Sequence, residues 1–289
     1  TPAKEAMSLH LTFNNMRQSE AVLDHVQQMF NELIKITDNK YPFHVRLNKE
    51  DDEKYHVGIN CKFQSKQLVS NVDDANLYKA LGKCIESIKN QVLKKELLNA
   101  VDAVLTHGRI VLGPEVEKFE KELARCTKRK FAVGVNSGTD ALYLGLRSMN
   151  IGPGDEVITS PLSWIATFHG IARCGATPIC IDIGSDQNIN PDKIEAAITP
   201  RTKAIVVVHF TGKICEMDQI MKIATQYGLD VVEDAAQAFG TIAGNKHIGT
   251  FGDFGIFSFG LAKNINCFYG GALVAKTLEL EKEAKYHIA

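Results

Sequence analysis

Residues 231–238 read VVEDAAQA: two β-branched residues run straight into two acids, which small residues follow. The apolar pair predicts the end of a buried strand, and the acids then stand at its carboxyl end, where open α/β sheets place their ligands. Asp234 and Gln237 are three residues apart, so both side chains can reach toward one ring. A carboxylate there favours the protonated form of a ring nitrogen. A helix cap is the alternative interpretation.

Outward from this stretch, apolar runs alternate with helical patterns over residues 96–289. The expected strands are Phe131–Val135, Glu156–Ser160, Thr177–Asp182, Ala204–His209, Asp230–Glu233, Gly255–Ser258 and Ala272–Ala275. The expected helices are Thr139–Met149, Trp164–Cys174, Pro191–Ile198 and Met217–Tyr227. The run AIVVVHF at 204–210 is apolar on both faces, as in a sheet covered on both sides. The alternation predicts an α/β fold with a mostly parallel sheet.

Two further clusters stand at ends of the expected strands. The first, NSGTDAL at 136–142, joins a strand to a helix. Its small residues and the free N–H groups of the helix N-terminus could hold an anion, although a simple N-cap also explains it. The second contains Trp164, the one tryptophan of the chain. It is either a core residue or an aromatic plate against a flat cofactor ring.

The last cluster is the glycine-rich stretch GDFGIFSFGLAKN at 252–264, which leads to Gly270 and Gly271. Lys263 stands there among apolar and glycine residues, with no acid beside it in the sequence. Such surroundings favour the nucleophilic amine that Schiff-base chemistry requires. A lysine in a surface loop is the alternative.

Together these clusters resemble the DegT/StrS family of pyridoxal-phosphate-dependent sugar aminotransferases over about residues 96–275. The segments LTHGRIVLGPEVEKFEKELA at 105–124 and VHFTGKICEMDQI at 208–220 fit the same family. The resemblance implies the large domain of the type-I aminotransferase fold and pyridoxal 5'-phosphate as the cofactor. It also implies transfer of an amino group, with glutamate as the expected donor, to a keto-sugar nucleotide.

The resemblance also assigns roles by position. Lys263 would carry the cofactor as a Schiff base and move the proton during transfer, and Asp234 would pair with the pyridinium nitrogen. Gln237 would bind the ring side near the phenolic oxygen, and Trp164 would stack on the ring. The phosphate would be bound by Gly138, Thr139 and Ser258.

Two features depart from the family pattern. Gly260 and Ala262 replace bulkier residues that are common before the lysine. The sequence also ends about 26 residues after Lys263, whereas family members continue into a small C-terminal domain. We therefore expect a truncated large domain, and the resemblance implies a homodimer.

Residues 1–95 have another character, with 14 Lys and Arg against 12 Asp and Glu. The patterns predict a β-α-β-β-β-α order and an independent α+β domain, in which two helices pack on one face of a four-stranded sheet. The expected elements are a strand at Ser8–Phe13, a helix at Ser19–Ile36 capped by Ser19, alternating strands at 43–47 and 55–63, a solvated turn at Glu50–Glu53, a strand at Gln67–Val72, and a helix reaching Val92 that Asp73 or Asp74 caps.

This arrangement, with LTFNNMRQSEAVLDHV at 11–26 and VSNVDDANLYKALGKCIESIKNQVLKK at 69–95, resembles the ribosome hibernation promoting factor family. The resemblance implies a contact with the small ribosomal subunit. Lys79, Lys83 and Lys94 project roughly opposite the apolar stripe of the last helix, so they are the expected contacts for rRNA phosphates. A solvated helix face is the alternative.

Composition bounds the remaining possibilities. The 289 residues suggest two domains, 1–95 and 96–289, and 33 basic against 34 acidic residues leave no global field for nucleic acid or membrane. No apolar run approaches a membrane span, and no signal peptide is recognisable, so a cytoplasmic location is expected. Seven cysteines without a C-x-x-C pair indicate neither a disulfide framework nor a zinc site, and no metal is expected.

Three alternatives stay open. The chain could be a ribosome hibernation factor whose aminotransferase-like half is an inactive or dimerising passenger. It could be a dehydratase of the same family, although dehydratases lack the Schiff-base lysine. The two halves could also be a fusion of unrelated families.

Overall fold

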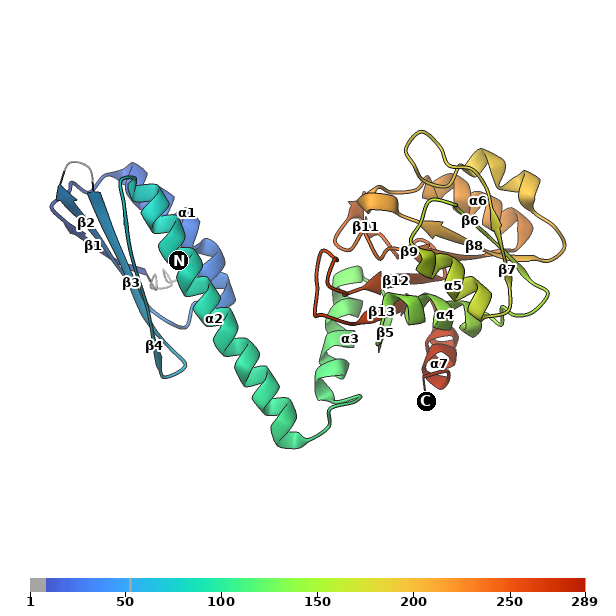
Figure 1. Ribbon diagram of the computed structural model, residues 1–289, viewed down its shortest axis with the longest axis horizontal. Helices are drawn as coiled ribbons and strands as arrows, with labels where there is room; N and C mark the ends of the chain where they lie inside the picture. Colours follow the sequence, from blue (N-terminus) through green and yellow to red (C-terminus); the bar gives the residue numbers. More distant parts are fainter. Residues whose placement is uncertain (1–8, 52–53, 289) are drawn as a thin grey trace, which may run out of the picture. The chain divides into compact units, whose positions relative to one another are not determined.

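The computed structural model describes residues 9–51 and 54–288, and the chain divides between Ile110 and Val111 into two units (Figure 1). We call them the N-terminal unit and the C-terminal unit. Neither unit contains, among its described residues, a helix that is both long and apolar enough to cross a membrane.

The N-terminal unit is a four-stranded sheet with two helices, in the predicted β-α-β-β-β-α order. Its elements are β1 (Leu9–Asn14), α1 (Glu20–Ile36), β2 (Phe43–Asp51), β3 (Lys54–Phe63), β4 (Lys66–Asp74) and α2 (Leu77–His107). The strands lie in the order β1-β2-β3-β4; β1 runs parallel to β2, and the other neighbours are antiparallel. Ser8 and the end of the expected turn, residues 52–53, lie outside the described residues; Glu50 itself belongs to β2.

Alternation along the strands builds the core of this unit. Phe43, Val45 and Leu47 of β2 are buried, while the residues between them are exposed. Buried side chains of α1, among them Val26 and Phe30, belong to the same core cluster. Ser19 caps α1 as expected, because its Oγ accepts a hydrogen bond from the N–H of Val22.

The N-terminal cap of α2 differs from the prediction of Asp73 or Asp74. Both residues belong to β4, where they pair with β3, so their backbone is not free to begin a helix. The cap is Asn76, whose Oδ1 accepts from the N–H groups of Tyr78 and Lys79 at 3.0 and 3.1 Å.

Helix α2 runs without a break past residue 95, where the composition changes. It continues to His107 and ends at Gly108, whose φ of 74° is left-handed and suits glycine. Residues 96–107 therefore continue the last helix of the N-terminal unit. The boundary between the two units falls after that helix.

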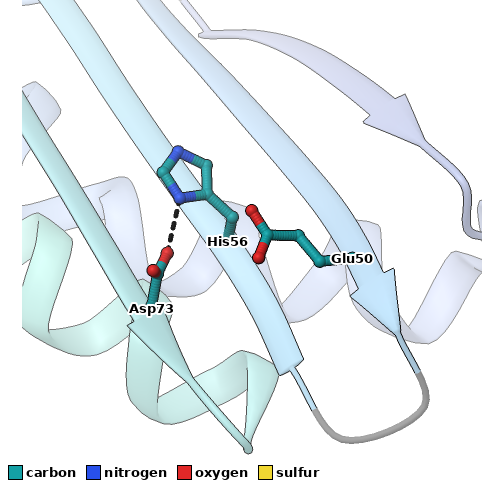
Figure 2. Close-up of side chains that lie close together, drawn as sticks. All are labelled: Glu50, His56 and Asp73. Carbon is teal, nitrogen blue, oxygen red and sulfur yellow. Dashed lines mark hydrogen bonds and ion pairs between the residues drawn. The ribbon is translucent and has the colours of Figure 1, made fainter.

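One charged network lies across β2, β3 and β4 (Figure 2). His56 Nδ1 lies 2.5 Å from Asp73 Oδ1, and the two side chains point toward one another, with Glu50 beside them. Each of these three residues offers one side-chain atom that could bind a metal ion, and the three atoms lie within 4.8 Å of one another. The ammonium of Lys54 forms ion pairs with Glu50 at 2.8 Å and Asp73 at 3.0 Å, so a cation of the chain already contacts both carboxylates.

The C-terminal unit is an α/β fold, as predicted, around a seven-stranded sheet. Its elements are α3 (Pro114–Thr127), β5 (Phe131–Val135), α4 (Gly138–Ser148), β6 (Glu156–Thr159), α5 (Ile165–Arg173), β7 (Thr177–Cys180), β8 (Thr202–Val208), α6 (Met217–Tyr227), β9 (Asp230–Asp234), β10 (Ile242–Ala243), β11 (Lys246–His247), β12 (Phe254–Ser258), β13 (Gly271–Ala275) and α7 (Leu278–Tyr286). The segment expected as a helix at Pro191–Ile198 is instead two 3₁₀ turns, Pro191–Lys193 and Glu195–Ala197.

The large sheet is mostly parallel and covered on both faces. Its order is β5-β13-β12-β9-β8-β6-β7, and β13 alone runs antiparallel to its neighbours. Separate apolar clusters lie against the sheet, one including α4 residues and another including α6 residues. The carboxyl ends of β5, β9 and β12 consequently meet at one edge, which positions the candidate site.

Candidate active site

A cavity of about 330 Å³ opens where β5, β9 and β12 end and α4 begins. All seven residues that the family resemblance assigned to cofactor binding line it: Gly138, Thr139, Trp164, Asp234, Gln237, Ser258 and Lys263. They come from four separate stretches of the chain, so the fold itself brings them together.

The N-terminus of α4 forms one end of the cavity. Ser137 caps this helix by accepting from the N–H of Asp140, which leaves the preceding N–H groups directed outward. A Cβ atom on Gly138 would lie 2.7 Å from the Cβ of Ser258, so only glycine lets this turn approach Ser258 so closely. The helix dipole, free N–H groups and a serine hydroxyl form a site suited to a phosphate group.

A buried carboxylate forms the floor of the cavity. Asp234 is 8% exposed; its Oδ2 accepts from the hydroxyl of Thr167 at 2.9 Å, and its Oδ1 accepts from the N–H of Ala236 at 3.2 Å. Burial raises the pKa of Asp234, an effect opposed by these two hydrogen bonds and by the charge of Lys263. Among the described residues no lysine, arginine or histidine forms an ion pair with Asp234. The site therefore suits a ligand that brings a positive charge.

Lys263 is carried by a loop whose two ends are tied together. The N–H of Phe259 donates to the carbonyl of Gly270 at 2.9 Å, and Gly270 forms a bridge with Ser137. A Cβ on Gly271 would lie 2.2 Å from the backbone of Ser137, so this contact requires glycine. The neck of the loop thus lies against the start of α4, and Lys263 is half-buried at the cavity wall.

Trp164 is 71% exposed, which excludes its interpretation as a core residue. It immediately precedes α5 and lines the cavity together with Gln237. The Oε1 atom of Gln237 accepts from the N–H of Thr211 at 3.1 Å, so the side chain is held in place. Trp164 presents a large apolar plate beside the buried carboxylate.

A second buried acid, to which the sequence analysis gave no role, lies directly beside Asp234 in β9. Glu233 is fully buried and accepts four hydrogen bonds, three of them from the N–H groups of Gly249, Phe251 and Gly252. The fourth comes from His209, whose Nε2 lies 3.0 Å away. The N–H of Cys215 donates to His209 Nδ1, so the ring proton is assigned to Nε2. The backbone N–H of His209 donates to the carbonyl of Asp234.

The three lysines expected to contact rRNA lie on one side of α2, at about 100° per residue. Lys79, Lys83 and Lys94 are all exposed. Lys83 also forms an ion pair with Asp74 at 2.8 Å. Lys83 and Lys94 border the same shallow groove along α2.

The sheet order and the cavity define the large domain of a type-I pyridoxal-phosphate aminotransferase fold. Residues 91–287 match the sequence model of the DegT/DnrJ/EryC1/StrS aminotransferase family. The chain belongs to this family. Residues 9–96 match a second one, described as sigma 54 modulation protein / S30EA ribosomal protein, which agrees with the resemblance of the N-terminal unit.

Among curated proteins, the spore coat polysaccharide biosynthesis protein SpsC of Bacillus subtilis (strain 168) is 47% identical over 190 residues, which are 65% of this chain and 49% of SpsC. Among solved structures, S. venezuelae DesV in complex with a ketimine intermediate is 43% identical, with a TM-score of 0.65 over 68% of this chain and 53% of DesV. NtdA of Bacillus subtilis with bound cofactor PMP is 38% identical, with a TM-score of 0.63 over 66% and 43%. The chain spans about half the length of these relatives.

Proposed function

We propose that the C-terminal unit binds pyridoxal 5'-phosphate through Lys263 and serves as the large domain of a sugar aminotransferase. The observation that carries the proposal is a single cavity that gathers a lysine, a buried carboxylate and a helix N-terminus. The proposal is supported by one relative named for polysaccharide biosynthesis and by another whose structure contains bound PMP. The proposed amino acceptor is a keto-sugar nucleotide, and the proposed donor is glutamate.

The side chains and backbone N–H groups that line the cavity fit this cofactor. The N-terminus of α4 and the Ser258 hydroxyl would hold the phosphate, and the glycine at 138 leaves room for both. Asp234 would face the ring nitrogen and keep it protonated, which relieves the cost of burying that carboxylate. When bound, the cofactor acts as an electron sink for carbanion chemistry.

The remaining chemistry belongs to side chains of this chain. Lys263 Nζ would take a proton from the α-carbon of the donor in one half of the reaction and would deliver a proton to the carbonyl carbon of the acceptor in the other half. Trp164 would cover one face of the ring, and Gln237 would hold its edge. Catalysis would thus depend on Lys263 for proton transfer and on Asp234 for charge.

A second subunit would complete the cavity. The rim carries large exposed apolar side chains, including Trp164, Leu261 and Tyr269, of which Tyr269 is 80% exposed. Such a rim is typical of a surface that another protein covers. We therefore include a homodimer in the proposed function.

The decisive experiment is the mapping of the cofactor adduct. Pyridoxal phosphate is titrated into the purified chain, visible absorption is recorded, and the adduct is reduced with borohydride and located by mass spectrometry. We expect the label at Lys263, loss of the label in Lys263→Ala, and no effect of Lys222→Ala, which removes an exposed lysine of α6. A reducible adduct spread over surface lysines, with none at Lys263, would contradict the proposal.

The substrate assignment needs a separate assay. The loaded chain is mixed with glutamate and a keto-sugar nucleotide, and formation of 2-oxoglutarate is followed. Amino transfer that requires Lys263 and slows steeply in Asp234→Asn is the expected result. Formation of 2-oxoglutarate without any aminated sugar would reject this acceptor.

A second candidate function concerns the N-terminal unit alone. We propose that it contacts the small ribosomal subunit, because residues 9–96 match a ribosomal-protein family and Lys79 and Lys94 are exposed on one side of α2. Co-sedimentation with small subunits should weaken as salt rises. The triple variant with Glu at 79, 83 and 94 should lose it, and sedimentation unchanged by the three substitutions would exclude this contact surface.

A further inference from the structure

The first turn of α4 carries an acid at the end of the helix where the proposed phosphate site needs positive charge. Asp140 directly follows Thr139, which lines the cavity, and its Oδ2 accepts from the hydroxyl of Ser137 at 2.8 Å. An acid in the first turn is favourable for the helix dipole. It is unfavourable for an anion at the same end, because a phosphate monoester carries about two negative charges at neutral pH. The carboxylate of Asp140 therefore opposes the group that this turn would bind.

The contact with Asp140 also decides what Ser137 can offer a ligand. The Ser137 hydroxyl has one proton, which it donates to Asp140, and its Oγ accepts from the N–H of Asp140 at 3.1 Å. Ser137 thus lines the cavity without a proton for a phosphate oxygen. The proposed phosphate site then depends on backbone N–H groups of the turn and on the hydroxyls of Thr139 and Ser258, which gain nothing from a negative charge beside them.

A cation from α5 pairs with this acid. Nη1 of Arg173, the last residue of α5, donates to Asp140 Oδ1 at 2.7 Å. The same guanidinium lies over the ring of Tyr143, 4.2 Å from the ring centroid. Asp140 and Tyr143 are three residues apart and so lie on one face of α4. Two contacts with that face therefore hold the positive charge of Arg173 beside the first turn.

The close packing of α5 against α4 directs Arg173 to this position (Figure 1). A Cβ atom on Gly170 of α5 would lie 2.9 Å from the side chain of Leu142 of α4, so the two helices approach closely there. Gly170 and Arg173 are three residues apart and lie on the same face of α5. The face of α5 that packs on α4 is thus the face that carries Arg173.

We propose that Arg173 is a positioning residue of the phosphate site, which compensates the charge of Asp140 so that the first turn of α4 accepts a phosphate group. The inference rests on the proposed function, because it adds a residue to the same cofactor site. Arg173 is outside the set of residues that line the cavity, so it would act through Asp140 and Ser137.

The exposure of the pair indicates where its effect would appear. The side chains of Arg173 and Asp140 are 46% and 24% exposed, and ion pairs of this exposure add little to the stability of the fold. Asp140 contacts a residue of the cavity wall, so salt screens its charge from a bound phosphate only in part. The pair should therefore affect the affinity for a charged ligand more than it affects folding.

The test compares two ligands that differ only in the phosphate group, pyridoxal phosphate and pyridoxal. Both carry the aldehyde that would react with Lys263, and their binding to the full chain is followed by visible absorption at neutral pH. Arg173→Met should lower the affinity for pyridoxal phosphate about fivefold and leave the affinity for pyridoxal unchanged. Arg173→Gln should give the same result, because its amide can donate to Asp140 but carries no charge. Arg173→Lys keeps the charge and should keep most of the affinity.

A second arm of the test removes the acid together with its partner. In the Asp140→Asn background, Arg173→Met should leave the affinity for pyridoxal phosphate unchanged, because no uncompensated carboxylate remains. Arg125→Met, which breaks an exposed ion pair with Glu122 on α3, is the matched control for the loss of a surface cation. It should change the affinity for neither ligand.

The remaining outcomes separate a wrong inference from a wrong function. Equal loss of affinity for both ligands in Arg173→Met, or the same loss in the Asp140→Asn background, would show that Arg173 acts on the fold and not on charge. Wild-type affinity of Arg173→Met for pyridoxal phosphate would show that Asp140 needs no compensation. Either result overturns this inference and leaves the proposed function standing. A wild type that forms no adduct at Lys263 with either ligand overturns the proposed function, and this inference with it.

Discussion

Thr167 and Asp234 are 67 residues apart in the chain, and the Thr167 hydroxyl donates a 2.9 Å hydrogen bond to the buried carboxylate of Asp234. Since this donor uses its only proton, Ser163, whose Oγ lies 2.7 Å from Thr167 Oγ1, must be the donor in that second pair. A relay from Ser163 through Thr167 to Asp234 thus joins the start of α5 to the end of β9. It stabilises the ionised form of a carboxylate that burial otherwise disfavours.

Replacing Thr167 with valine should weaken cofactor binding without disturbing the fold. The substitution keeps the shape but removes a hydrogen bond that favours the ionised carboxylate, so the pKa of Asp234 rises further and its pairing with a cationic ring weakens. Absorbance titration with pyridoxal phosphate at neutral pH measures this. Thr225→Val, at an exposed position of α6, is the matched control. Equal affinity of Thr167→Val and wild type would refute the relay.

The cofactor-free chain should lose stability as pH rises through the range above 3.8, the ordinary pKa of Asp234. Its folded pKa is raised by burial, so the folded state binds more protons than the unfolded state there. The free energy of unfolding therefore falls with rising pH until the carboxyl is fully ionised in both states. Urea unfolding at successive pH values should show this fall in the free energy of unfolding, and Asp234→Asn should remove the part of the fall that Asp234 causes.

An exposed acid should show the opposite sign. The ammonium of Lys193 lowers the pKa of Asp182, so any stability it contributes is present above the ordinary pKa and is lost as pH falls through the folded value. Asp182→Asn should therefore leave unchanged the fall in the free energy of unfolding that Asp234 causes as pH rises. Identical pH profiles for wild type and Asp234→Asn would show that Asp234 does not titrate as described.

Two glycines in α4 should respond differently to alanine. At Gly138 the added Cβ would lie 2.7 Å from the Ser258 side chain, so the turn and the strand end must separate and the phosphate site opens. At Gly145 the nearest atom, of Phe254, lies at 3.6 Å, an ordinary contact, and alanine favours a helix by up to about 1 kcal/mol. Calorimetric titration should show a loss of at least tenfold in cofactor affinity for Gly138→Ala alone. Comparable cofactor affinities in the two variants would contradict the close approach of Gly138 to Ser258.

Glu233→Gln should destabilise the C-terminal unit by about 2–5 kcal/mol, because a neutral amide would replace a buried acceptor of four hydrogen bonds. Whichever oxygen the amide NH₂ group replaces, two N–H donors would then face that group. Urea unfolding followed by tryptophan fluorescence measures this, since the one tryptophan lies in that unit. Glu216→Gln, at an exposed position, should change little. A Glu233→Gln chain as stable as the wild type would mean that the loop at 249–252 does not depend on this carboxylate.

The sequence predicts the large sheet well because its strands are short β-branched runs between turns, a pattern with few alternatives. It also places the site residues at strand ends, which the parallel topology brings to one edge. The prediction of a helix at Pro191–Ile198 was wrong, because two buried residues, Pro191 and Ile194, provide too little periodicity to separate an α-helix from 3₁₀ turns.

Other features depend on contacts that no local pattern contains. The cap of α2 depends on how far β4 pairs with β3, which decides between Asp74 and Asn76. The role of Glu233 follows from strand alternation, which directs it away from the cavity toward the loop at 249–252. The ion pair between Lys83 and Asp74 likewise forms only once the fold brings the end of β4 next to α2.

In the proposed function, the tied neck between Phe259 and Gly270 would make the amine of Lys263 a tethered reagent. A reactive group on a short closed loop meets its target with an effective molarity that can reach about 10⁵ M in well-oriented cases. Free amines dissolved at molar concentration are far more dilute than this. Chemical rescue of Lys263→Ala by added methylamine should therefore restore a small fraction of the lost rate, and cutting the loop should be nearly as damaging as removing the lysine itself.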